Sequence, residues 1–386
     1  MDKKMSTNKW NPYVQLRGEE TLSFFKTHFN NSNKKLLFIL GKGFDVRMNI
    51  VIAKLLESCP AINIQCLLIE FNEGDSSHSH TYKPLVDENL TELTTLIGSS
   101  KIIRKSISLF NRDTKNKKRI GDRQAATIIK DFSELSAFTD VILDISALPR
   151  GVYSSLIGKI LSILDGEENK TMPINFFTSV AENAEIDMKV QGYGSDNDLN
   201  YLFGFGGGIE LSAENEKPII WFPILGENKV EHFNKAFTYI ISSQNRPYEI
   251  CPILPFPAKN LRRVDSLIIE YHKVLFDKLL IESKNIMYVP EQNPFEAYLS
   301  LNNTIKNYNT SLGPLNGCKA VISNFSSKLL SIGTILTAHE LQQEIGVGIL
   351  NVDSEGYKIN NIEEIKNLKS QSELFLSWLS GDPYND

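Results

Sequence analysis

The residues best placed to do chemistry lie in the stretch Gly41-Lys42-Gly43-Phe44-Asp45-Val46-Arg47. Its two glycines allow the backbone to turn tightly and to approach a ligand. Asp45 can cap a following helix or accept a hydrogen bond from a ligand hydroxyl. Arg47 can offer a two-pronged donor to a phosphate or a carboxylate. The stretch predicts either an anion-binding turn or an ordinary tight turn, with Asp45 as helix cap and Arg47 paired to a surface acid.

The segments around this stretch predict how it is positioned. The apolar run 36–40 precedes it, an amphipathic segment follows to about residue 58, and a second apolar run, 62–69, ends in Glu70. This order reads as strand, turn, helix, strand and acid. In an open α/β sheet, ligands lie beyond the carboxyl ends of such strands, and a helix N-terminus attracts anions. The third glycine of the dinucleotide-binding fingerprint is missing.

The first motif also carries a family resemblance. Leu40, Gly41, Gly43, Phe44, Asp45 and Arg47 match the pattern Leu-Gly-x-Gly-apolar-Asp-x-Arg. This pattern resembles the first motif of class I methyltransferases of the leucine carboxyl methyltransferase type. The resemblance implies S-adenosylmethionine over this turn, with Glu70 on the ribose hydroxyls. Asn72 stands where the family usually has a second acid, and the second half of the chain reads as another sheet rather than the family's antiparallel hairpin.

A second constellation consists of Asp144, Ser146 and Arg150. A carboxylate at the end of a strand and an arginine in the next helix can orient a ribose and a phosphate, respectively. Alternatively, Asp144 and Ser146 satisfy free N–H groups near the start of that helix. No histidine lies near Ser146 in the sequence, so a Ser-His-Asp triad is not predicted.

The third constellation is Ser327 and Lys328, after the predicted strand 319–323. The segment resembles the strand–helix junction of the CRISPR-associated Rossmann (CARF) ligand sensors. In that family a Ser/Thr-Gly-Thr-Lys turn meets the phosphates of the ligand, and Ser326 here stands in place of the glycine. The alternative is a serine-capped helix with Lys328 in solvent.

The periodicity of the whole chain predicts an α/β protein. From residue 218 onward, five apolar runs alternate with four helical patterns, as in a parallel, doubly wound sheet. The first half follows the same rhythm, so we expect two tandem Rossmann-like domains with mainly parallel sheets. The expected division is a polar leader at 1–33, a first domain at 34–184, a glycine-rich linker or loop at 185–216, and a second domain at 217–386.

The composition excludes several classes of protein. Of the residues, 41% are hydrophobic and 23% are charged, which is typical of a globular protein, and the net charge of -5 gives no strong nucleic-acid signal. No apolar stretch approaches the roughly 20 residues that span a bilayer, so no membrane association is predicted. The scattered cysteines form no ligand cluster, so we predict no metal site and a reducing, cytoplasmic location.

Three functions follow from these features. The leading hypothesis is binding of a nucleotide-type anionic ligand in a Rossmann-like crevice, as a sensor or a hydrolase-like effector subunit with protein partners. The second is an S-adenosylmethionine-dependent methyltransferase, so the expected cofactor is a nucleotide or S-adenosylmethionine. The third is a non-catalytic scaffold subunit of a multiprotein complex, because a fold does not by itself confer a function.

Overall fold

The chain divides into two compact units. The computed structural model describes residues 8–73, 78–111, 118–194, 199–206, 217–243, 247–354 and 356–384. The first unit, as named here, comprises Pro12–Gly194 and Ser354–Asp386, and the second unit comprises Met1–Asn11 and Ser195–Asp353. Each unit contains its own sheet and its own hydrophobic core.

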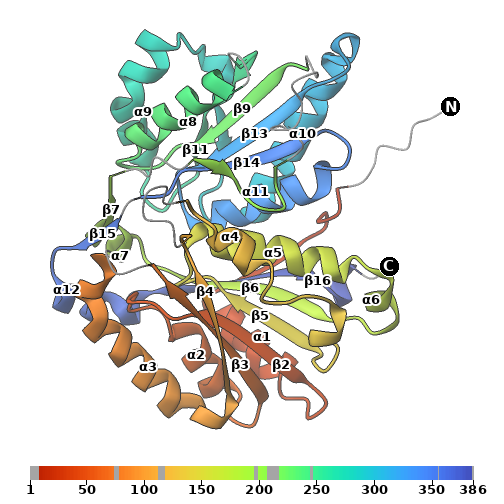
Figure 1. Cartoon of the computed structure of the whole chain (residues 1–386), viewed down its shortest axis with the longest axis vertical. Helices are drawn as coiled ribbons and strands as arrows, with labels where there is room; N and C mark the ends of the chain where they lie inside the picture. Colours follow the sequence, from red (N-terminus) through yellow and green to blue (C-terminus); the bar gives the residue numbers. More distant parts are fainter. Residues whose placement is uncertain are drawn as a thin grey trace. The chain divides into compact units, whose positions relative to one another are not determined.

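The first unit is built on a sheet of five parallel strands with two more at one end (Figure 1). Numbered along the chain, the parallel strands lie in the order 3-2-1-4-5, which is the doubly wound Rossmann arrangement. A strand near the C-terminal end of the chain pairs antiparallel with the fifth parallel strand. A strand near the N-terminal end pairs antiparallel with that added strand. In sheet order the strands are β4 (Ile102–Ser108), β3 (Asn63–Asn72), β2 (Lys35–Gly41), β5 (Asp140–Asp144), β6 (Asn175–Glu182), β16 (Glu373–Ser380) and β1 (Val14–Arg17).

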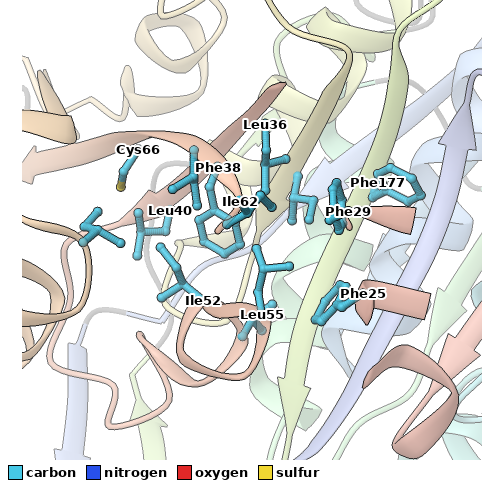
Figure 2. Packing of buried hydrophobic residues seen from close by; sticks show 14 of the residues in the cluster. Phe25, Phe29, Leu36, Phe38, Leu40, Ile52, Leu55, Ile62, Cys66 and Phe177 are labelled. Atoms are coloured by element: carbon cyan, nitrogen blue, oxygen red, sulfur yellow. The ribbon is translucent and has the colours of Figure 1, made fainter. Parts of the chain in front are cut away.

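Helices cover both faces of this sheet. Figure 2 shows the packing on one face. Phe25 of α1, Phe29 just after that helix, and Ile52 and Leu55 of α2 share a cluster there with the apolar side chains of β2, such as Phe38. The connection from β2 to β3 crosses the sheet in one direction, and the connection from β5 to β6 crosses it in the other. Because both connections are right-handed, their helices lie on opposite faces of the sheet. The helices of this sheet are α1 (Glu19–His28), α2 (Ile50–Ser58), α3 (Lys83–Ile97), α4 (Gly121–Ala125), α5 (Arg150–Leu164) and α6 (Glu167–Thr171).

A smaller subdomain of the first unit joins two distant segments of the chain. A two-stranded antiparallel sheet is formed by β7 (Val190–Tyr193) and β15 (Gly356–Ile359). The helix α7 (Ala184–Lys189) precedes the first of these strands, and α12 (Ile362–Leu368) follows the second. We call these four elements the cap.

The second unit repeats the strand order of the first. Its parallel strands also lie in the order 3-2-1-4-5, and a short antiparallel strand again follows the fifth. Pro252 has no amide hydrogen, and the second strand is interrupted there. The strands are β12 (Met287–Val289), β11 (Ile253–Pro255) with β10 (Glu249–Ile250), β9 (Ile219–Ile224), β13 (Lys319–Asn324), β14 (Val347–Asn351) and β8 (Asn200–Tyr201), and the helices are α8 (Val230–Ser243), α9 (Arg263–His272), α10 (Pro294–Ser311) and α11 (Lys328–Leu341).

The predicted fold class is confirmed: the chain is an α/β protein with two mainly parallel, Rossmann-like sheets. The expected extents of the segments differ from the structure in three places. Residues 1–33 are more than a leader, because they contain β1 and α1, and residues 217–386 include β16, which pairs in the first sheet. The segment 185–216 contains most of α7 together with β7 and β8, and its residues 195–198 and 207–216 lie outside the described ranges.

None of the helices in the described ranges combines the length and the apolarity needed to cross a membrane.

Candidate functional site

The carboxyl ends of β2, β3 and β5 meet at one place in the first unit. β2 lies between the other two strands, so the chain leaves it toward β3 on one side and later returns to β5 on the other. This is the topological switch point, where ligands bind in open α/β sheets. Gly41 ends β2 opposite Ile69 of β3. The turn after Gly41 is therefore bordered by Glu70 and by the loop that follows Asp144.

Residues 42–49 form the turn between β2 and α2. The Lys42 amide donates to a carbonyl of β3 at 2.8 Å, which prolongs the pairing of the two strands. The carboxylate of Asp45 then accepts from the Arg47 amide at 2.9 Å and closes a tight turn. One prediction from the sequence was that Asp45 caps the next helix, and this prediction is wrong. The helix begins only after Asn49, so Asp45 stabilises the loop instead.

Arg47 is a buried cation that lies between two carboxylates. Its Nε and Nη2 donate to Asp45 at 3.0 and 2.8 Å, and Nη2 also donates to Asp187 of α7 at 2.8 Å. Burial opposes the guanidinium charge, but the two carboxylates outweigh it and raise the pKa of Arg47 above its ordinary value. The donors that the sequence offered to a ligand are thus bonded within the protein, because a buried cation needs such partners.

Glu70 is a partly exposed acid beside the turn. Its side chain is 24% exposed, and its Oε1 accepts from Lys42 Nζ at 3.3 Å and from Arg104 at 3.0 Å. The Ser106 hydroxyl lies 3.5 Å from Oε2. A carboxylate has about four acceptor positions, so these donors leave room for another. Glu70 lies on β3 one residue beyond the last pair that this strand makes with β2.

The two glycines of the turn allow the loop after β5 to approach. An added Cβ at Gly41 would lie 2.4 Å from the Leu148 side chain, and one at Gly43 would lie 3.1 Å from the Ala147 carbonyl oxygen. Neither glycine has a positive φ. These glycines therefore allow close packing between the two loops at the switch point, and neither is required by a left-handed backbone conformation.

Two backbone amides of the turn have no hydrogen-bond acceptor within the described residues. They are the amides of Gly43 and Phe44. Gly43 is buried and Phe44 is half-buried. An unpaired N–H group costs free energy unless a ligand or water meets it, and successive amides in a turn can bind an anion.

Asn89 of α3 supports the turn, and sequence reasoning missed it. Its Nδ2 donates to the carbonyls of Gly43 and Asp45, both at 2.9 Å, and its own carbonyl accepts from Asn49 Nδ2 at 2.8 Å. The two accepting carbonyls lie 46 and 44 residues away along the chain. No local pattern in an amphipathic helix indicates so distant a partner.

The second constellation holds the loop between β5 and α5. The amide and hydroxyl of Ser146 donate to Asp144 Oδ1 at 2.9 and 2.6 Å, and the same hydroxyl oxygen accepts from the Ala181 amide at 2.9 Å. Asp144 and Ser146 are each 1% exposed. They satisfy N–H groups of this loop and of β6. Arg150 begins α5 and is partly exposed.

The third constellation lies in the second unit, beside that unit's own switch point between β9 and β13. Ser327 is the N-cap of α11, and its hydroxyl accepts from the Leu330 amide at 3.3 Å. Lys328 is the first residue of the helix and is partly exposed. This geometry is that of a serine-capped helix, the alternative that the sequence left open.

Arg263 occupies the switch point of the second unit, and sequence reasoning did not foresee its partners. Its guanidinium donates to both oxygens of Glu227 at 2.6 and 2.8 Å, to Glu291 at 2.5 Å and to the Ser326 hydroxyl at 3.3 Å. Burial raises the pKa of Glu227, but Arg263 outweighs burial and brings that pKa below its ordinary value. Each unit thus places an arginine between two acids beside its central strand.

The ion pairs around the first turn balance in charge. Three cations take part in them, and so do three carboxylates. Because these charges cancel, the ion pairs themselves carry no net charge. The groups in these ion pairs are Lys42, Arg47, Arg104, Asp45, Glu70 and Asp187.

Comparisons with known proteins do not assign a family. No family model matches the sequence, and no curated protein matches it. A Pseudomonas aeruginosa UCBPP-PA14 structure assigned to the universal stress proteins aligns at 9% identity and a TM-score of 0.23, covering 89% of this chain and 100% of its own. A universal stress protein of Archaeoglobus fulgidus DSM 4304 aligns at 7% identity and a TM-score of 0.22, covering 82% and 96%. Likenesses this weak carry no statement about function.

Proposed function

We propose that the first unit binds a nucleotide-type ligand at the switch point beside β2. The observation that carries this proposal is a partly open carboxylate, Glu70, next to a turn whose Gly43 and Phe44 amides are unbonded. Glu70 accepts hydrogen bonds from the ribose hydroxyls, and the two amides donate to one phosphate. A ligand bound in this way makes the chain a sensor or an effector subunit.

The charge of the site narrows the ligand further. The ion pairs around the turn are neutral, and Arg47 is already bonded to two acids. A nucleoside monophosphate brings one phosphate to the two amides, whereas a triphosphate brings several charges without matching cations. We therefore expect AMP to bind more tightly than ATP.

S-adenosylmethionine is the second candidate, and the end of the sheet favours it. The methyltransferase resemblance implies antiparallel strands after the parallel ones, and β16 and β1 supply such strands from the two ends of the chain. The ligand's amino acid portion is zwitterionic and its sulfonium is positive, which suits a site without excess positive charge. Its ribose would use the same acid, Glu70.

Isothermal titration calorimetry of the full chain with AMP, ATP and S-adenosylmethionine tests the proposal. The variant Glu70→Gln removes the charge and keeps the size of the side chain. We expect it to weaken binding of the preferred ligand about 10- to 100-fold, because hydrogen bonds to a charged group contribute about 1.5–3 kcal/mol. We expect the unfolding midpoint to shift little.

Glu373→Gln is the matched control. Glu373 is 26% exposed and pairs with Arg17 at 2.9 Å, but it lies on β16, with β6, β5 and β2 between that strand and β3. We expect this variant to bind as the parent does. Equal affinities for the parent and Glu70→Gln would refute the placement of the ribose. No heat with any of the three ligands at millimolar concentration would favour the scaffold alternative.

A further inference from the structure

The cap and the turn 42–49 of the first unit share one small hydrophobic core. Val46 from the turn is buried against Ile186 of α7 and Ile365 of α12, and Phe44 packs against the same cluster. The Phe44 ring lies 5.9 Å from that of Tyr357 in β15. Side chains of the turn therefore form part of the interior of the cap.

An ion pair joins the same two parts. Arg47 Nη2 lies 2.8 Å from Asp187 on α7 while it also bonds to Asp45 within the turn. The Arg47 side chain is 5% exposed, whereas that of Asp187 is 50% exposed. The buried member of the pair thus belongs to the turn, and the more accessible member belongs to the cap.

Backbone amides and side chains of successive turn residues make different contacts. The amides of Gly43 and Phe44 are unbonded, whereas the side chains of Phe44, Val46 and Arg47 contact the cap. Phe44 combines the two features, because its amide makes no hydrogen bond to the described residues and its ring packs against the shared core. A ligand that fixes the backbone here must also restrict the side chains that support the cap.

We infer that ligand binding at the turn is transmitted to the cap. This inference rests on the proposed function, since it requires a ligand at the Gly43 and Phe44 amides. Binding orders the turn, and the turn then stabilises α7, β7, β15 and α12. Coupling of this kind is reciprocal, so loosening the cap also loosens the turn.

Hydrogen-exchange mass spectrometry of the full chain, with and without AMP, tests the inference. In the parent, AMP slows exchange in the turn, 42–49, and slows it about fivefold or more in the cap peptides 184–193 and 356–368. In Asp187→Asn, AMP still slows exchange of the turn, but the effect on the cap falls below about twofold, because the ion pair that joins them is weakened.

The matched control is Glu185→Gln. Glu185 lies on the same helix, is exposed, and makes no ion pair among the described residues. This variant removes the same charge from α7, and we expect it to behave as the parent does. Protection of the turn by AMP in the parent, with the cap unchanged, would overturn the inference.

A ligand-free measurement separates this inference from the proposed function. Without AMP, Asp187→Asn must exchange faster than the parent in both the cap and the turn, while Glu185→Gln exchanges at the parent's rate. If AMP protects nothing in the parent but this ligand-free difference is seen, the ligand proposal fails and the coupling stands. If Asp187→Asn leaves exchange of the turn unchanged, the coupling itself fails.

Discussion

At the scale of single residues, a paired arginine lies at the switch point of each unit: Arg47 in the first and Arg263 in the second. Each guanidinium lies between two carboxylates from different segments of the chain, and each is nearly buried. A buried guanidinium must be paired, so its partners are part of the packing rather than optional. In the first unit our proposal therefore assigns the ligand contacts to Glu70 and the backbone amides.

Replacing Arg47 by alanine should destabilise the first unit. The substitution leaves Asp45, whose side chain is 15% exposed, without its cation. We expect a loss of about 3–5 kcal/mol in the free energy of unfolding, measured by urea denaturation followed by circular dichroism. The control is Lys54→Ala, whose ammonium pairs with Glu57 at 2.7 Å on an exposed helix face.

That control should change the free energy of unfolding by no more than about 0.5 kcal/mol, because exposed ion pairs contribute little. Equal losses for the two variants would contradict the structural role of Arg47. The sequence indicated that Arg47 would be paired or would bind a ligand. It could not identify Asp187, which lies 140 residues away and approaches only through the tertiary fold.

At the scale of elements, the strands were predictable and the turn geometry was not. The first of the apolar runs expected after residue 218 forms β9 (Ile219–Ile224), because a run of apolar residues suits a strand buried on both faces. The position of Glu70 beside the turn followed from the same reasoning. The start of α2 did not, since the turn is held by Asn89 and by the loop after β5 rather than by local capping.

Close packing of loops at the switch point predicts a compensating pair of substitutions. Gly41→Ala should cost about 1–3 kcal/mol, because the new methyl group meets the Leu148 side chain. In a Leu148→Ala background the same substitution should cost much less, since the obstructing atoms are gone. Urea denaturation of the four proteins gives the coupling free energy.

Gly226 in the second unit provides the contrast. A Cβ there would lie 2.1 Å from the carbonyl oxygen of Phe325, which is backbone. Truncating a side chain cannot relieve that contact, so Gly226→Ala should remain destabilising in a Phe325→Ala background. Additive losses for the Gly41 and Leu148 pair would contradict the packing described for the first turn.

At the scale of the whole molecule, the two units are interleaved along the chain. The first unit takes β1 from near one end of the sequence and β16 from near the other. The strand order within each sheet follows from local alternation of strands and helices, which the sequence displays. The pairing of β16 with β6 joins segments about 200 residues apart. No local sequence pattern indicates this pairing, which explains the misplaced domain boundary.

A chain that ends at Gln371 lacks β16 and should lose the integrity of the first unit. Phe375 and Leu376 would no longer cover the core, and β6 would present an unpaired edge. We expect aggregation in size-exclusion chromatography and loss of helical circular dichroism. A control that ends at Tyr384 keeps the strand and should match the parent. A monodisperse, fully helical protein without β16 would contradict the sheet described.

The most direct test of the central claim is a crystal structure of the full chain soaked with AMP. The account predicts electron density at the switch point of the first unit, with the ribose hydroxyls within hydrogen-bond distance of Glu70. The phosphate should accept from the amides of Gly43 and Phe44. Well-ordered crystals in which this place holds only water, or in which AMP binds elsewhere, would contradict the account.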